Sequence, residues 1–252
     1  MPNLSQFIRK FNRFELKYLL PLRQAEEIKR DLRAYVEPDR HGDLHGSYFL
    51  TSLYYDGPDL RFYWEKLDGI KFRRKLRIRR YGNGAPLTAE TPVFVEIKQR
   101  INRVTQKRRA QMSYADALRL CSQREAPEHN VQDAALVDEV LSMAWQYNLR
   151  PSSVVRYQRQ AFVGGEYDPG LRVTFDTDLS YRSANLDLAE SQTGDDLPLF
   201  PGDWAVMEIK VNERVPYWLT EVVAEHNLNI TRVSKYCKSI ELATALELQA
   251  NF

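Results

Sequence analysis

The stretch Pro92–Arg100, PVFVEIKQR, carries the pattern from which the fold is predicted. Apolar Val93, Val95 and Ile97 alternate with a second set, Phe94, Glu96, Lys98 and Arg100. Such alternation is typical of a β-strand with one face on a core. Because residues two apart lie about 6.6 Å from each other on one face, Glu96 and Lys98 lie together and Ile97 points away.

The triplet Glu-aliphatic-Lys recurs at Glu15-Leu16-Lys17 and Glu208-Ile209-Lys210, both inside alternating segments. Chance pairing of the 18 Glu and 11 Lys predicts about one such spacing, and four occur. The fourth, Glu27-Ile28-Lys29, falls in a predicted helix and is set aside. The other three predict strands that carry acid and base on one face and aliphatic side chains on the other.

Eight strands are predicted along the chain, enough to close a barrel, with five helices between and after them. The strand segments are 12–19, 47–55, 73–81, 92–100, 106–113, 153–163, 171–179 and 203–211, and the helices are 21–35, 113–122, 131–148, 216–228 and 236–249. Ser113 and Asp116 form a capping pair at the second helix. The expected fold is α+β: a closed antiparallel β-barrel that forms a tunnel, with helices packed outside, in a single domain over residues 1–252.

Composition excludes several classes of protein. The net charge of +2 excludes a generally polycationic mode, and 43% hydrophobic residues excludes disorder over most of the chain. No stretch approaches the ~18 apolar residues of a membrane-spanning helix, so a cytoplasmic protein is expected. Cys121 and Cys237 have no neighbouring metal-ligand pattern and are predicted to be buried free thiols.

Cations follow one another on a single face of the segment 73–81, at Arg73, Lys75, Arg77 and Arg79. Neighbours at 6.6 Å repel by about 2.5 kcal/mol at an effective dielectric of 20, before solvent screening. A solvated face is the alternative, but such a face normally mixes signs. The spacing favours a polyanion, with or without a divalent cation, beside these strands.

Charges that point into a barrel would line a tunnel. Arginine would clamp phosphate oxygens bidentately, lysine would act as a point charge, and carboxylates would hold Mg²⁺ or Mn²⁺ through oxygen ligands. A narrow tunnel suits linear polyphosphate better than a nucleic-acid duplex, so no nucleic-acid partner is expected. The phosphate-loop motif of other nucleotide enzymes is absent from the sequence.

Eight motifs in order resemble the VTC domain, the polyphosphate polymerase domain of the triphosphate tunnel metalloenzyme superfamily, in a stand-alone bacterial form. They are RFELKY 13–18, SLYYD 52–56, LRIRRYG 76–82, VFVEIKQR 93–100, YQRQAF 157–162, RVTFDTDL 172–179, VMEIKV 206–211 and SKYCKSI 234–240. The resemblance implies a tunnel that adds the γ-phosphate of ATP, or of another nucleoside triphosphate, to growing inorganic polyphosphate with Mn²⁺ or Mg²⁺. It also leaves room for a membrane-protein partner supplied by another chain.

The resemblance also implies roles for individual residues. The phosphate-binding residues would be Lys17, Arg77, Arg79, Lys98, Arg159, Arg172, Lys210, Lys235 and Lys238. Arg77, Arg79, Lys98, Lys210 and Glu208 would form the catalytic set, and Glu208 and Glu96 would hold the metal.

Two alternatives stay open. One is a metal-dependent triphosphate or polyphosphate hydrolase, which Arg13 weakens because related triphosphatases carry the first glutamate of Glu-x-Glu-x-Lys there. The other is a non-catalytic polyphosphate-binding module, which gains nothing from a carboxylate such as Glu208 facing a phosphate chain. Arg156 and Arg159 have opposite strand parity, and the motif YQRQAF favours Arg159 for the phosphate side.

Overall fold

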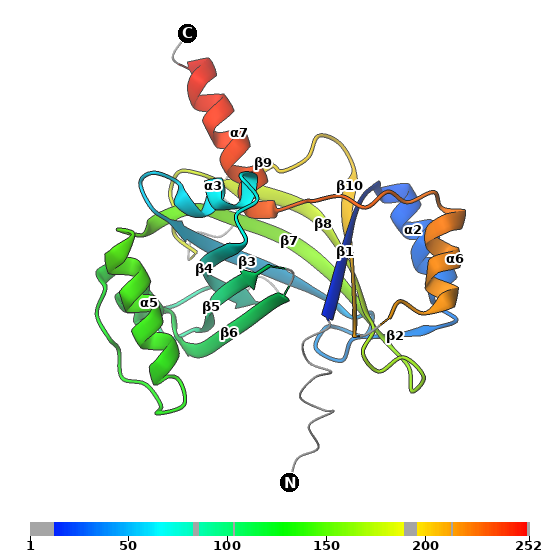
Figure 1. The fold of residues 1–252 in the computed structure, drawn as a ribbon, viewed down its shortest axis with the longest axis horizontal. Helices are drawn as coiled ribbons and strands as arrows, with labels where there is room; N and C mark the ends of the chain where they lie inside the picture. Colours follow the sequence, from blue (N-terminus) through cyan, green and yellow to red (C-terminus); the bar gives the residue numbers. More distant parts are fainter. Residues whose placement is uncertain (1–12, 83–85, 103, 189–195, 213, 251–252) are drawn as a thin grey trace. The chain divides into compact units, whose positions relative to one another are not determined.

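A computed structural model describes residues 13–82, 86–102, 104–188, 196–212 and 214–250 (Figure 1). The chain forms two compact units, each assembled from three segments. Unit 1 comprises Met1–Phe49, Tyr157–Leu179 and Phe200–Val233, and unit 2 comprises Leu50–Arg156, Ser180–Leu199 and Ser234–Phe252. β3, β7 and β8 each contribute residues to both units. The single domain expected over residues 1–252 stays a prediction.

All eight predicted strands are present, with boundaries within a few residues of the expected ones. They are β1 Arg13–Pro21, β3 Ser47–Asp56, β4 Phe72–Tyr81, β5 Pro92–Ile101, β6 Val104–Ser113, β7 Arg150–Gly164, β8 Arg172–Arg182 and β10 Trp204–Asn212. Two short strands, β2 Val36–Pro38 and β9 Leu197–Pro198, have no alternating pattern long enough to be predicted. The turn that joins β7 to β8 requires Gly164, since a Cβ there would lie 2.2 Å from the Asp168 carbonyl oxygen.

The five predicted helices are also present. They are α2 Leu22–Leu32, α4 Tyr114–Leu118 with the π-helical turn η1 Arg119–Gln123, α5 Ala134–Gln146, α6 Tyr217–Glu225 and α7 Lys235–Ala250. The capping pair is confirmed, because the Asp116 backbone N–H donates to Ser113 Oγ. No helix in the described part of the chain is both long enough and apolar enough to cross a membrane.

Helix α3, Arg61–Leu67, was not predicted because its start has no local capping sequence. The chain enters it through Leu60 in a left-handed conformation, φ 53°. Its first backbone N–H groups, those of Phe62 and Tyr63, donate to the carboxylate of Asp56, which lies upstream in β3. The helix therefore depends on a carboxylate that the sequence does not place at its N-terminus.

Unit 1 packs the apolar face of β1, β10 and β8 against α2 and α6, which lie side by side (Figure 1). The antiparallel register aligns Leu16 with Ile209 and Ile209 with Val173, so these side chains share the apolar face. Ile28 of α2 and Leu219 of α6 belong to the same buried cluster. The opposite face of these strands therefore carries Lys17, Glu208 and their neighbours, as the alternation predicts.

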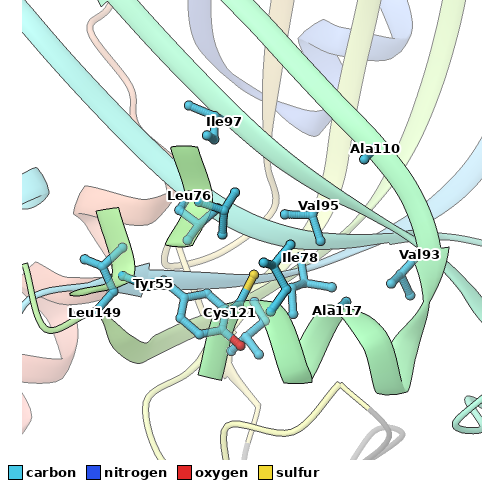
Figure 2. Close-up of a cluster of buried hydrophobic side chains, with 14 of the residues drawn as sticks. Tyr55, Leu76, Ile78, Val93, Val95, Ile97, Ala110, Ala117, Cys121 and Leu149 are labelled. Atoms are coloured by element: carbon cyan, nitrogen blue, oxygen red, sulfur yellow. The ribbon is translucent and has the colours of Figure 1, made fainter. Parts of the chain in front are cut away.

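Unit 2 repeats the arrangement with β3, β4, β5 and β6. Leu76 and Ile78 of β4 and Val93, Val95 and Ile97 of β5 are fully buried with helical residues that include Ala117 and Cys121 (Figure 2). Cys121 and Cys237 are both buried free thiols, as expected. The charged residues of β4 and β5 are thereby directed to the other side of the sheet.

The closed barrel expected from the sequence is wrong. In unit 1 the strands pair in the order β1-β10-β8, with β1 at the end. In unit 2 they pair in the order β3-β4-β5-β6, with β6 at the end. Among the described residues the strands β1 and β6 do not pair with each other, as closure would require. The outer edge of β1 is taken by a bridge between Tyr18 and Ile230, and Thr231 N–H donates to the Lys17 carbonyl oxygen at 2.7 Å. The outer edge of β6 exposes Lys107, Arg108 and Arg109, which oppose pairing with a further strand.

Replacing Ile209 with alanine should lower the free energy of unfolding by about 2 to 5 kcal/mol, because it leaves a cavity in the core of unit 1. Ile230, which is 64% exposed, is the matched control, and its replacement by alanine should cost less than about 0.5 kcal/mol. Urea unfolding followed by circular dichroism measures both. Equal losses for the two variants would contradict the assigned core.

Candidate functional site

The cations of unit 2 lie in two rows across β4, β5 and β6. The register aligns Lys75 with Lys98 and Lys98 with Lys107, and it aligns Arg77 with Glu96 and Glu96 with Arg109. Since partners in register share a face, one face of the three strands carries basic side chains around a single carboxylate. The face separation predicted from the alternation is confirmed in these strands.

Glu96 is the acidic centre of this face and is 1% exposed. Its Oε2 accepts from Arg77 Nη2 at 2.6 Å and from Arg77 Nε at 2.9 Å, and its Oε1 accepts from Lys107 Nζ at 3.2 Å. Burial by itself would raise the pKa of Glu96, but Arg77, Arg79 and Lys107 lower it to about 2. The carboxylate is therefore ionised at any physiological pH.

Tyr54 of β3 completes the surroundings of Arg77, because its hydroxyl accepts from Arg77 Nη1 at 3.0 Å. Burial raises the pKa of this phenol, whereas the charges of Arg77, Arg79 and Lys75 lower it, to about 8. Arg79 is held by Ser52, whose Oγ accepts from Arg79 Nε at 2.9 Å. The sequence offers no signal for the role of Tyr54, since a tyrosine in a strand pattern is most simply a core residue.

The N-terminus of α7 is joined to the same face of unit 2 through Lys75. Lys75 Nζ donates to Ser234 Oγ at 2.7 Å and lies 5.0 Å from the centre of the Tyr236 ring. The Tyr236 hydroxyl donates to the Asp56 carboxylate. In the first turn of α7, Lys235 is buried, and Lys238 is more exposed and pairs with Glu241 at 3.5 Å.

The charged face of unit 1 is built from β1, β10 and β8. Lys17 Nζ lies 3.1 Å from Glu15 Oε1 and 3.0 Å from Glu208 Oε1, and Lys210 Nζ lies 3.1 Å from Glu208 Oε2. Burial lowers the pKa of Lys17, but Glu208 and Glu15 raise it above its ordinary value. At Lys210, burial and the positive charge of Arg159 lower the pKa by more than the negative charge of Glu208 raises it, so the pKa of Lys210 lies below its ordinary value.

Two arginines of unit 1 are held by buried carboxylates. Arg159 of β7 makes a bidentate pair with Asp176, Nε to Oδ1 at 2.6 Å and Nη2 to Oδ2 at 2.7 Å. Arg172 Nη2 lies 2.7 Å from Asp39 Oδ2 and donates to the Tyr48 hydroxyl at 3.0 Å. Arg156 pairs instead with Asp196, which like Arg156 belongs to unit 2, at 3.1 Å.

The structure distributes the sequence-predicted residues over the two faces. Unit 1 brings together Lys17, Arg159, Arg172, Glu208 and Lys210, and unit 2 brings together Arg77, Arg79, Glu96 and Lys98 with Lys235 and Lys238 in its α7 segment. Sequence reasoning assigned no role to Asp39, Tyr54 or Asp176. Asp39 lies outside the strands, where parity gives no information, and the cross-strand partners of Tyr54 and Asp176 depend on register.

A divalent metal expected from the sequence would need oxygen ligands. Among the described residues no three or more His, Cys, Asp or Glu side chains are grouped so as to hold one. Mg²⁺-type ions commonly bind to one or two carboxylates together with substrate phosphates, and Glu208 supplies a carboxylate of this type beside lysines that attract phosphate. The donor chemistry therefore fits a metal shared between Glu208 and a phosphate ligand.

The chain is similar to one known family and to several known proteins. The VTC domain family model matches residues 12–244. Subunit 4 of the vacuolar transporter chaperone complex from Trypanosoma brucei brucei is 27% identical over 221 residues, and that from Trypanosoma cruzi is 27% identical over 223 residues. Each alignment covers 76% of this chain and 28% of the relative, so the chain spans about a quarter of their length.

Solved structures show the same fold at low sequence identity. A candidate adenylate cyclase from Bacillus halodurans has a TM-score of 0.52 at 14% identity, over 88% of this chain and 95% of that one. A candidate adenylyl cyclase from Hippeastrum, described as having a dominant triphosphatase activity, has a TM-score of 0.52 at 16% identity, over 88% and 92%. The family match confirms the resemblance to the VTC domain that the eight motifs predict.

Acid should destabilise the wild-type chain more than it destabilises the Glu96→Gln variant. The folded-state pKa of Glu96 is about 2 against an ordinary value of 4.5, so its contribution is complete above pH 4.5 and is lost as the pH falls towards 2. From about pH 6 to about pH 3 the wild-type free energy of unfolding should fall by about 2 kcal/mol more than that of the variant. Urea unfolding across this range tests it, and parallel pH dependences would refute the assigned environment of Glu96.

Proposed function

This chain belongs to the VTC domain family, and from that premise we propose that it is a polyphosphate polymerase, which transfers the γ-phosphate of ATP to a growing polyphosphate chain. The relatives bear the name of a vacuolar transporter chaperone subunit, and the fold is shared with proteins named for chemistry on nucleoside triphosphates. These names support a phosphate-transferring enzyme.

The observation that carries the proposal is the excess of cations on the charged face of unit 2. Across β4, β5 and β6 this face presents eight basic residues around Glu96, namely Arg73, Lys75, Arg77, Arg79, Lys98, Arg100, Lys107 and Arg109. Their mutual repulsion makes the face costly without an anion. A chain of phosphates, with a negative charge on each unit, matches a row of cations spaced two residues apart.

Phosphoryl transfer asks for positioning and charge neutralisation and little covalent chemistry from side chains. Arg77 and Arg79 would hold phosphate oxygens through guanidinium N–H groups, and Lys98 would contribute a point charge. On the face of unit 1, Arg159, Arg172, Lys17 and Lys210 would do the same. Lys235 and Lys238 would add cations from the first turn of α7.

We propose that Glu208 holds a divalent metal, Mn²⁺ or Mg²⁺, together with phosphate oxygens of the substrate. Such an ion, when bound, supplies positive charge that neutralises the phosphate oxygens during transfer. Lys17 and Lys210 contact the two oxygens of Glu208 at 3.0 and 3.1 Å and keep the carboxylate oriented. A metal role for Glu96, also expected from the sequence, stays a prediction.

ATP and inorganic polyphosphate are the ligands that follow from this proposal, and nucleic acid is not expected among them. The trypanosome relatives are named as subunits of a complex. This supports the expectation that a partner on another chain, such as a membrane protein, acts together with this one.

Incubation of the purified chain with ATP and Mn²⁺, with assays for long-chain polyphosphate and for free phosphate, tests the function. Polyphosphate supports the polymerase and free phosphate alone supports the hydrolase. Tight triphosphate binding without either product supports a binding module. If neither product forms and triphosphate does not bind, a phosphate-related function is refuted.

Two substitutions should separate binding from turnover. Arg77→Ala should weaken triphosphate binding by about 10- to 100-fold, because it removes charge-assisted hydrogen bonds. Glu208→Gln should abolish turnover and keep much of the anion affinity. Arg108→Ala is the matched control, because Arg108 is aligned with Ile97 on the opposite face and pairs with Glu139. Unchanged activity in both test variants would contradict the assigned site.

A further inference from the structure

Two arginines assigned to phosphate binding are each tied to a carboxylate that is almost completely shielded from solvent. Arg77 forms an ion pair with Glu96, which is 1% exposed, and Arg159 forms an ion pair with Asp176, which is 0% exposed. We propose that Glu96 and Asp176 are positioning residues, which set the guanidinium planes of Arg77 and Arg159 for phosphate. The inference rests on the proposed function, because it takes phosphate as the ligand of these arginines.

In unit 2 the guanidinium of Arg77 is held from two sides. Glu96 Oε2 accepts from Nη2 and Nε of Arg77, and the Tyr54 hydroxyl accepts from Nη1. The other oxygen of Glu96 accepts from Lys107. Three contacts to three nitrogen atoms fix the plane of the group, so its conformational freedom is removed before any ligand binds.

In unit 1 the guanidinium plane of Arg159 is fixed by a bidentate ion pair. Arg159 Nε and Nη2 meet the two oxygens of Asp176 at 2.6 and 2.7 Å, the parallel geometry that is specific for arginine and carboxylate. Asp176 is aligned with Val206 of β10, and Arg159 Nη2 also lies 3.9 Å from Glu208 Oε2. Asp176 therefore sets the orientation of Arg159 beside the carboxylate proposed to hold the metal.

The contacts of Glu96 favour this role over the metal role expected from the sequence. Both of its oxygens accept from cationic N–H groups, and the residues in register with it on β4 and β6 are Arg77 and Arg109. Glu208 also meets cations with both of its oxygens, but the close ones are the ammonium groups of Lys17 and Lys210, whereas Oε2 of Glu96 accepts from two N–H groups of one guanidinium. A carboxylate that accepts twice from one planar group orients that group.

The sign of the effect on binding separates orientation from simple charge. A carboxylate next to an anion site repels the anion, so by charge alone its replacement by an amide would strengthen phosphate binding. If the carboxylate orients the guanidinium, the same replacement weakens binding, because the arginine must then be ordered at the cost of affinity. The two explanations predict opposite changes.

Calorimetric titration of the full chain with inorganic tripolyphosphate, without added metal, tests the inference. Glu96→Gln and Asp176→Asn should each raise the Kd by about 10-fold or more. Glu139→Gln, the matched control, removes a carboxylate from Arg108, to which it hydrogen-bonds at 2.7 Å, and should change the Kd by less than about twofold. An unchanged or lower Kd in both test variants would overturn the inference.

A double-mutant cycle distinguishes orientation from a general loss of structure. In an Arg77→Ala background, Glu96→Gln should no longer weaken tripolyphosphate binding, since the group that it orients is gone. Continued weakening in that background would show a merely structural role and overturn the inference.

If Glu96→Gln does not fold, Glu96→Asp keeps the charge and shortens the side chain. The Glu96→Asp variant should have a melting temperature within a few degrees of the wild type, and its Kd for tripolyphosphate should still be severalfold higher. A Kd equal to that of the wild type would overturn the inference. A wild-type chain that binds no tripolyphosphate would instead contradict the proposed function itself, so the two failures are distinguishable.

Discussion

Repulsion between like charges on one face of a sheet is the constraint on which the rest of this structure depends. Strand geometry places every second side chain on the same face, and the register then brings the basic residues of β4, β5 and β6 next to one another. Lysine and arginine in such rows destabilise the fold unless carboxylates or a bound anion offset the charge. The buried acids of this chain offset part of the charge.

Those acids have no common pattern in the sequence, but they share one structural role. Glu96, Asp176 and Asp39 are each buried and each contacts an arginine that belongs to the proposed phosphate-binding set. Glu208 differs, because its nearest partners are the lysines Lys17 and Lys210, and Arg159 lies farther away at 3.9 Å. Ammonium groups are point charges that adapt to a ligand, whereas guanidinium groups need a fixed plane. This difference gives a physical reason for separating a metal-sharing carboxylate from orienting ones.

Much of the fold followed from alternation alone. The triplets Glu15-Leu16-Lys17, Glu96-Ile97-Lys98 and Glu208-Ile209-Lys210 all lie in strands with the aliphatic residue on the core side, since the period of two forces this separation. The predicted barrel closure failed because period two says nothing about which strands pair. The backbone of 230–231 covers the edge of β1, and no alternating pattern announces that contact.

The sequence by itself determined which residues lie on the charged face of each strand, and through its eight motifs it also determined the family. Only the tertiary structure decided which carboxylate meets which cation, for example Asp176 with Arg159 and Glu208 with Lys17. The physical reason is that side-chain parity is a local property of one strand. Ion pairing depends on the register between different strands, and the packing of the core sets this register.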